Sequence, residues 1–238
     1  MLTIGIVSVP FYFEGEKKIL KALEGAKEMK KHVDALLIIN NENLLELYKD
    51  LNFFNAFHKA DDTLANAARS ISEIISESLY INVDFQDVKT TLKDSGSAII
   101  ATAVAEGEGR ITKAINAALH SPLLKDHDIN TSKRLLLKFM CSKDGGSPIL
   151  AQEINEITGF TSKLSGIDVK WGIGDDPTLG EKVKITVLAS GFDVTISEGQ
   201  DKETIILKND NEADKTETTK QQKAQETEIA KVYGMDKV

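Results

Sequence analysis

The stretch LTIGIVSVPFYFEGEKKILKALEGAKEMKKHVDALLIIN, residues 2–40, predicts a strand, a helix and a second strand. LTIGIVSV is an apolar run that ends before Pro10, and VDALLIIN, at 33–40, is another. Because a parallel pair needs a right-handed crossover, this order predicts an α/β unit whose strand ends lie together and carry the ligand-binding loops. Between the runs, apolar residues recur at helical spacing on one face: Ile19, Ala22, Leu23, Ala26 and Met29.

The rest of the chain predicts a long helix followed by a second folded region. Apolar residues at helical spacing continue from Leu64 to Leu79. Beyond Gly96, six segments predict strand, helix, strand, helix and a terminal hairpin, which together form an α+β sandwich with a four-stranded sheet and two helices. These segments are SAIIATAVAEG, RITKAINAALHSPLL, KRLLLKFMCSK, PILAQEINEITGF, IDVKWGIG and EKVKITVLASGF.

Composition and charge narrow the class of protein. The chain has 238 residues, enough for two domains with cores of their own. Its net charge of -8 argues against non-specific attraction to nucleic acid or to an anionic membrane surface. One cysteine excludes an intramolecular disulfide, and no segment approaches the roughly 20 apolar residues of a membrane span. We therefore expect a soluble, cytoplasmic protein.

Two glycine-containing segments and a polar segment near the end have simple interpretations. AEGEGR, residues 105–110, predicts a strand-to-helix turn, because its two glutamates would repel a phosphate. In DGGSP, Ser147 and Pro148 predict a helix cap and a first-turn proline. Residues 209–228 contain only two apolar side chains, both alanine, so this segment predicts a disordered tail.

The segment INVDFQDV, residues 81–88, gathers an amide and two acids at a junction between helices. Asp84 is suited to cap the following helix, and Asp87 would lie in its first turn, where the helix dipole favours a carboxylate. Alternatively, Asn82, Asp84 and Asp87 project together and orient a water molecule toward an electrophile. From the residues alone, a capping role and half of an active site both remain open.

The motif NVDFQDV resembles the synergy loop of the FtsZ family of bacterial cell-division proteins, which are relatives of tubulin. The resemblance runs from about Leu2 to Phe192. Other segments match the family in the same order: PFYFEGEKK, VDALLIINNENLL, AFHKADDTL, SGSAIIATAVAEGEGR, SPLL and VKITVLASGF.

The resemblance implies a cytoskeletal GTPase that polymerises head to tail and acts at the division site. In this family the synergy loop enters the nucleotide pocket of the neighbouring subunit. Asn82, Asp84 and Asp87 are therefore the expected catalytic residues, supplied to the next subunit. The expected partners are further copies of the chain and other division proteins that bind the C-terminal tail or domain. Neither nucleic acid nor direct membrane binding is expected.

The same resemblance implies where the nucleotide binds. Glu14 and Lys18 match positions that contact the sugar and phosphates, Phe57 matches a ring that packs on guanine, and Asp61 matches a group that reads the guanine edge. Asn41 falls in a neighbouring loop on the nucleotide side. The expected ligand is GTP or GDP, accompanied by Mg²⁺, with no metal site built from protein ligands alone. Lys18 replaces the usual arginine, which keeps the charge but loses the bidentate fork.

The glycine-rich phosphate loop of the family is missing from the sequence, so a fragment that is inactive alone is expected. Residues 1–80 would be an α/β remnant of the GTP-binding domain with its long central helix. Residues 81–195 would be the synergy loop and the α+β C-terminal domain, and 196–238 a flexible acidic linker or tail. The alternative is a non-catalytic filament-capping or partner-binding fragment, in which the two acids only cap a helix.

Overall fold

The computed structural model describes residues 1–48, 52–76, 79–80, 83–121, 124, 129–143, 147–192, 194–198 and 203–207. The first part alternates strands and helices: β1 (Ile4–Val9), η1 (Tyr12–Glu14), α1 (Glu16–Lys30), β2 (Ala35–Asn40), α2 (Glu42–Leu47) and α3 (Phe53–Ser76). The second part contains α4 (Phe85–Leu92), β3 (Gly96–Ala105), α5 (Arg110–Leu119), η2 (Ile129–Thr131), β4 (Arg134–Cys141), α6 (Ala151–Thr161), β5 (Asp168–Asp175), η3 (Pro177–Leu179), β6 (Val183–Ser190), β7 (Val194–Glu198) and β8 (Glu203–Leu207). The predicted strand, helix and strand over residues 2–40 are confirmed.

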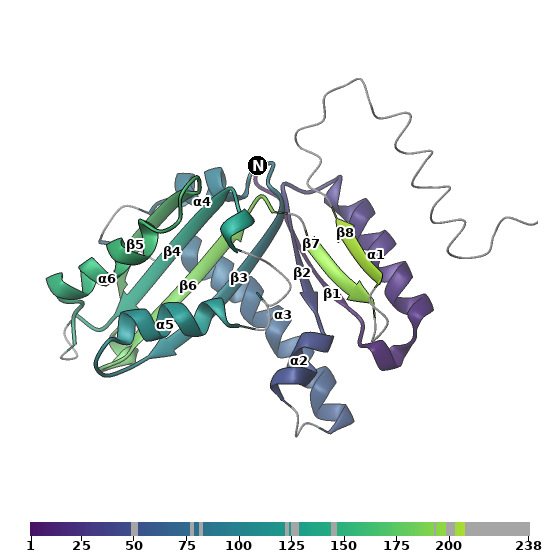
Figure 1. Ribbon diagram of the computed structural model, residues 1–238, viewed down its shortest axis with the longest axis horizontal. Helices are drawn as coiled ribbons and strands as arrows, with labels where there is room; N and C mark the ends of the chain where they lie inside the picture. The colour runs from purple at the N-terminus through teal and green to yellow at the C-terminus, as the bar shows by residue number, and fades with distance from the viewer. Residues whose placement is uncertain are drawn as a thin grey trace, which may run out of the picture.

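One mixed six-stranded sheet, ordered β1-β2-β3-β6-β4-β5, runs through both parts of the chain (Figure 1). β1, β2 and β3 are parallel, β6 is antiparallel to β3 and β4, and β5 is parallel to β4. β3, β6, β4 and β5 supply the four expected strands, but residues 35–37 of β2 pair with 96–98 of β3. A separate four-stranded sandwich is therefore not confirmed.

The predicted terminal hairpin is wrong, because β6 lies between β3 and β4 and does not pair with β5. The physical reason is burial. β6 (VKITVLAS) is buried at seven of its eight positions, as an interior strand is, whereas the first half of β5 is partly exposed, as an edge strand is. The apolar pattern predicted that both segments are strands, but it did not predict which strands they pair with in the sheet.

Helices cover both faces of the sheet, which gives three layers (Figure 1). On one face α1 packs over β1 and β2, and α5 over β3 and β6; α1, α5 and α6 share one core with Leu137 and Phe139 of β4. On the other face α3 and α4 pack against Leu37 and Leu136, through Ile71, Ile74, Val88 and Leu92. Successive residues of β4 thus face opposite cores, as the strand period of two requires.

Two predicted helix ends differ in the structure. α3 ends at Ser76, before the predicted Leu79, which instead forms a β-bridge with Gly174 on β5. α6 begins at Ala151, so Ser147 and Pro148 do not cap it or form its first turn. Their carbonyl oxygens instead accept hydrogen bonds from the Arg110 guanidinium.

The turn predicted for residues 105–110 is confirmed. Gly107 and Gly109 connect β3 to α5 with φ angles of 76° and 64°. Residues other than glycine rarely adopt this left-handed backbone conformation, so the two glycines suit the turn.

The end of the chain is described only in part. β7 and β8 form an antiparallel pair, so part of the segment expected to be a flexible linker carries strands. The predicted disordered segment at 209–228 lies outside the described residues. Within the described ranges, no helix combines the length and apolar character that crossing a membrane requires.

Candidate functional site

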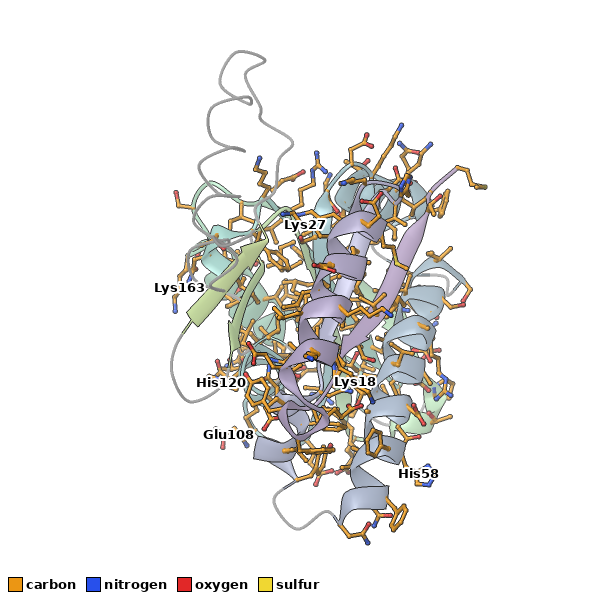
Figure 2. All side chains as sticks on the ribbon, turned by 90° about the vertical axis from the view of Figure 1, so that its right-hand side faces the viewer. Lys18, Lys27, His58, Glu108, His120 and Lys163 are labelled. Atoms are coloured by element: carbon orange, nitrogen blue, oxygen red, sulfur yellow. The ribbon has the colours of Figure 1, made fainter. Side chains whose placement is uncertain are left out.

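The carboxyl ends of β1 and β2 meet at one edge of the sheet, as the strand-helix-strand pattern predicts. Glu14, in η1 just after β1, accepts a hydrogen bond from the Phe11 amide at 3.0 Å. Its second carboxylate oxygen lies 3.2 Å from the Lys18 ammonium, at the start of α1. Lys18 is exposed, and Figure 2 shows it toward the same end of the molecule as His58 of α3. The Glu14 carboxylate and the Lys18 ammonium therefore lie side by side beyond these strand ends.

Asn41 follows β2 directly and is only 6% exposed. Its amide donates a 3.2 Å hydrogen bond to the carbonyl of Val9, which ties the loop to the end of β1. Its side-chain Oδ1 is buried and has no hydrogen-bond partner among the described residues. Because buried polar atoms are nearly always paired, this oxygen is an acceptor suited to a donor from outside the chain.

An aromatic cluster lies beside these loops. Phe11, fully buried, stacks on Phe13 with ring centroids 4.9 Å apart, and Phe57 of α3 meets both rings edge-on at 5.3 and 6.0 Å. Asp61 lies one helical turn after Phe57 and is exposed. Residues four apart share a helix face, so a half-buried ring and a carboxylate are presented together.

The two acids of the segment NVDFQDV form a reciprocal capping box at the start of α4. The Asp84 carboxylate accepts from the Asp87 amide at 3.0 Å, and the Asp87 carboxylate accepts from the Asp84 amide at 3.1 Å. Asp87 also lies 3.8 Å from the ammonium of Lys170 on β5. The predicted capping role is confirmed, and Asn82 lies outside the described residues.

The residues that follow β1 and β2 and the acids of α4 lie toward opposite sides of the sheet. Glu14 and Asn41 follow β1 and β2, whereas Asp87 lies beside β5, the strand at the other edge (Figure 1). Five strand spacings separate the edges, or about 24 Å at roughly 4.8 Å each. A single chain therefore does not bring the acids to the strand ends.

A buried ion pair between α5 and α6 has no signal in the sequence pattern. Arg110 is 5% exposed and donates two hydrogen bonds, of 2.7 and 3.0 Å, to Glu153. These bonds lower the pKa of Glu153 and raise that of Arg110. Arg110 also donates to the carbonyl oxygens of Ser147, Pro148 and Glu181. This network joins the two helices to nearby loops and has a structural role.

Two other observations concern charged and metal-binding side chains. Lys138 lies inside the apolar strand RLLLKFMC and is 2% exposed, a position where lysine is rare. In the part of the chain that the structure describes, no group of three or more histidine, cysteine, aspartate or glutamate side chains is arranged to hold a metal ion.

The chain is similar to a protein family and to several known proteins. Residues 96–193 match the family model described as FtsZ family, C-terminal domain. The chain is 53% identical over 195 residues to the cell division protein FtsZ of Porphyromonas gingivalis (strain ATCC BAA-308 / W83), an alignment that covers 82% of this chain and 42% of the relative. It is 36% identical over 202 residues to the mitochondrial division protein fszA of Dictyostelium discoideum, covering 84% of this chain and 38% of that protein.

Solved structures agree with this match. An empty FtsZ dimer from M. jannaschii superimposes with a TM-score of 0.70 at 33% identity, covering 80% of this chain and 55% of that one. The chain thus spans about half the length of these relatives, or less.

Proposed function

Residues 96–193 belong to the FtsZ family, as its C-terminal domain, and on this premise we propose that the protein acts as a cytoskeletal GTPase of cell division. Copies assemble head to tail into filaments at the division site. Each copy contributes part of a GTP site and supplies the synergy-loop acids to the site of its neighbour. The activity belongs to the assembled filament, and this chain by itself is inactive.

The observation that carries the proposal is the separation of the two groups of site residues. Glu14 and Asn41 lie beyond the ends of β1 and β2, and Asp87 lies beside β5 at the far edge. Groups that lie toward opposite sides of a six-stranded sheet, several strands apart, cannot act on one bound nucleotide. A head-to-tail interface, in which different surfaces of two identical subunits meet, joins such groups and continues into a filament.

The residues at the strand ends suit a guanine nucleotide. The buried Oδ1 of Asn41 can accept from a base or sugar donor. The Phe57 ring offers an apolar surface for a base, and Asp61 can accept from the N–H groups of guanine. Glu14 can accept from sugar hydroxyls, and Lys18 attracts phosphate. Mg²⁺ accompanies the phosphates, because this ion is usually held by phosphates, waters and one or two carboxylates.

The acids at the start of α4 provide the chemistry for the neighbour. Each carboxylate in the capping box has acceptor capacity left after its bond to a backbone amide. Asp84 and Asp87 can therefore accept from a water molecule and hold it for in-line attack on the terminal phosphate, since phosphoryl transfer depends mainly on positioning and charge. Asn82 is proposed as a catalytic residue only because of its position in the segment NVDFQDV.

One observation favours a second candidate function. The capping box gives both acids a complete structural role without any ligand. A filament-capping or partner-binding chain would need these acids only as caps. The two candidates differ in whether the negative charges matter beyond the stability of α4.

A complementation assay separates the two candidates. The acceptor is P. gingivalis FtsZ in which the acids equivalent to Asp84 and Asp87 have been replaced, and this chain is titrated into it while GTP turnover is measured. We expect turnover to appear and to saturate. A chain carrying Asp84→Asn and Asp87→Asn should restore none, although asparagine caps a helix as well as aspartate does.

The control variant is Asp34→Asn, an acid just before β2 that accepts a hydrogen bond from the Thr3 amide and lies outside both groups of site residues. It should restore turnover as the unsubstituted chain does. If the double asparagine variant restores turnover equally, the acids are caps only. If no chain restores turnover although co-sedimentation shows that it joins the filament, the donor role is wrong.

A further inference from the structure

A buried lysine contacts the last turn of the central helix. Lys138 lies on the same face of β4 as Leu136, which packs in the core beneath α3 and α4. Its ammonium donates a 2.8 Å hydrogen bond to the carbonyl oxygen of Glu73. Glu73 is among the last four residues of α3, whose carbonyls have no partner within the helix. The lysine thus places a positive charge at the negative end of the helix dipole.

A second lysine, Lys184, forms an ion pair with the side chain of Glu73. Lys184, on the adjacent strand β6, lies 3.3 Å from the Glu73 carboxylate and 4.0 Å from that of Asp176. Glu73 is therefore bound twice, through its backbone by β4 and through its side chain by β6. The apolar contacts of α3 with the sheet are non-directional, whereas these polar contacts fix the position of the last turn.

The last turn of α3 leads directly to the acids. Shortly after Ser76, Leu79 bridges to Gly174 and the Tyr80 amide donates a 2.8 Å hydrogen bond to the Ile173 carbonyl. Asp84 then begins α4. Only residues 77–83 separate the end of α3 from Asp84, so the position of the last turn limits where the acids can lie.

We propose that Lys138 and Lys184 are positioning residues, which fix the end of α3 on the sheet and thereby place Asp84 and Asp87 for the neighbouring subunit. This inference rests on the proposed function. Burial of the Lys138 ammonium carries a desolvation cost, and an apolar side chain of similar size often preserves stability at such a site. The lysine therefore serves the position of the helix rather than the stability of the core.

The test uses Lys138→Met and Lys184→Met in the complementation assay, with Lys113→Met as a matched control, an exposed lysine on α5. Two quantities are measured for each chain: the maximal turnover and the concentration that gives half of it. Misplaced acids should lower maximal turnover about tenfold while the half-saturating concentration stays unchanged, since a displacement near 1 Å can cost up to about a hundredfold. Lys138→Arg, which keeps the donor, should recover part of the loss, and Lys113→Met should lose nothing.

A merely structural role would give a different result. Partial unfolding would raise the half-saturating concentration and leave the maximum unchanged, and that outcome overturns the inference. A maximal turnover equal to that of the unsubstituted chain in both methionine variants also overturns the inference. Lys184 is partly exposed, so its variant decides the question if Lys138→Met does not fold.

Hydrogen exchange of the Tyr80 amide tests the inference without GTP. Loosening of the last turn should speed its exchange about tenfold in either methionine variant and not in Lys113→Met. If the unsubstituted chain restores no turnover, the proposed function fails and exchange alone decides the role of the lysines. Unchanged exchange would then overturn that role.

Discussion

The capping box at the start of α4 predicts a measurable loss of stability when Asp84 is replaced. In Asp84→Ala, the Asp87 amide loses the carboxylate that accepts from it at 3.0 Å. The opposite bond, from the residue 84 amide to the Asp87 carboxylate, is retained because it uses only the backbone of residue 84. Asp84 is exposed, so its truncation leaves no cavity. The expected loss is that of one N-cap, about 1 kcal/mol.

Asparagine at the same position separates the cap from the charge. Asp84→Asn keeps the side-chain oxygen that accepts from the Asp87 amide, so the free energy of unfolding should fall by less than about 0.5 kcal/mol, because the two residues rank alike at the N-cap.

Urea unfolding of the chain, followed by circular dichroism, measures both variants against the unsubstituted protein. The midpoint for Asp84→Ala should move without a change in slope. Equal midpoints for all three proteins would refute the capping argument. A loss above about 3 kcal/mol would also refute it, because such losses arise at buried networks.

Three further predictions concern the ion pair and the packing that stabilise the fold. Arg110→Met should lower the free energy of unfolding by about 3–5 kcal/mol in urea titrations, because it leaves the Glu153 carboxylate partly buried without its cation; a loss below about 1 kcal/mol would contradict this. Arg110 lowers the pKa of Glu153 below its ordinary value of 4.5, so the stabilisation is complete above that pH and is lost as the pH falls through the lowered folded-state pKa. Acid should therefore destabilise the unsubstituted protein more steeply than Glu153→Gln, and parallel acid curves would count against the ion pair. Gly174→Ala should cost about 1–3 kcal/mol in thermal unfolding, because a Cβ there would lie 2.6 Å from both Leu79 and Met140; an unchanged midpoint would show that this packing yields easily.

Local patterns predicted the elements of the fold better than their arrangement. The apolar runs before Pro10 and at 33–40 predicted the parallel pair β1 and β2, because their side-chain pattern already fixes the strands. The position of β6 between β3 and β4 could not be predicted, since pairing partners depend on burial from both faces. The end of α3 was misplaced because Leu79 continues the helical spacing although it pairs with β5.

For the candidate site too, local sequence predicts single residues better than their arrangement in space. The capping role of Asp84 and Asp87 follows from their spacing and the following helix, so it could be predicted from local sequence. The separation of these acids from Asn41 across the sheet depends on strand order, which local sequence does not contain. The contact of Lys138 with Glu73 joins residues 65 positions apart, and only the fold brings them together.

The central claim is that one subunit supplies acids to the nucleotide site of another, and mixing two inactive variants tests it most directly. A full-length P. gingivalis FtsZ in which this chain replaces the matching segment is made in two forms. One carries Phe57→Ala and Asp61→Ala, and the other carries Asp84→Asn and Asp87→Asn.

GTP turnover is measured for each form alone and for an equal mixture. Each form alone should be inactive. In a randomly mixed filament about a quarter of the head-to-tail interfaces join an intact nucleotide side to intact acids, so the mixture should recover about a quarter of the unsubstituted turnover. A mixture no more active than the average of its two components would contradict the claim, because both halves of the site would then have to belong to one subunit.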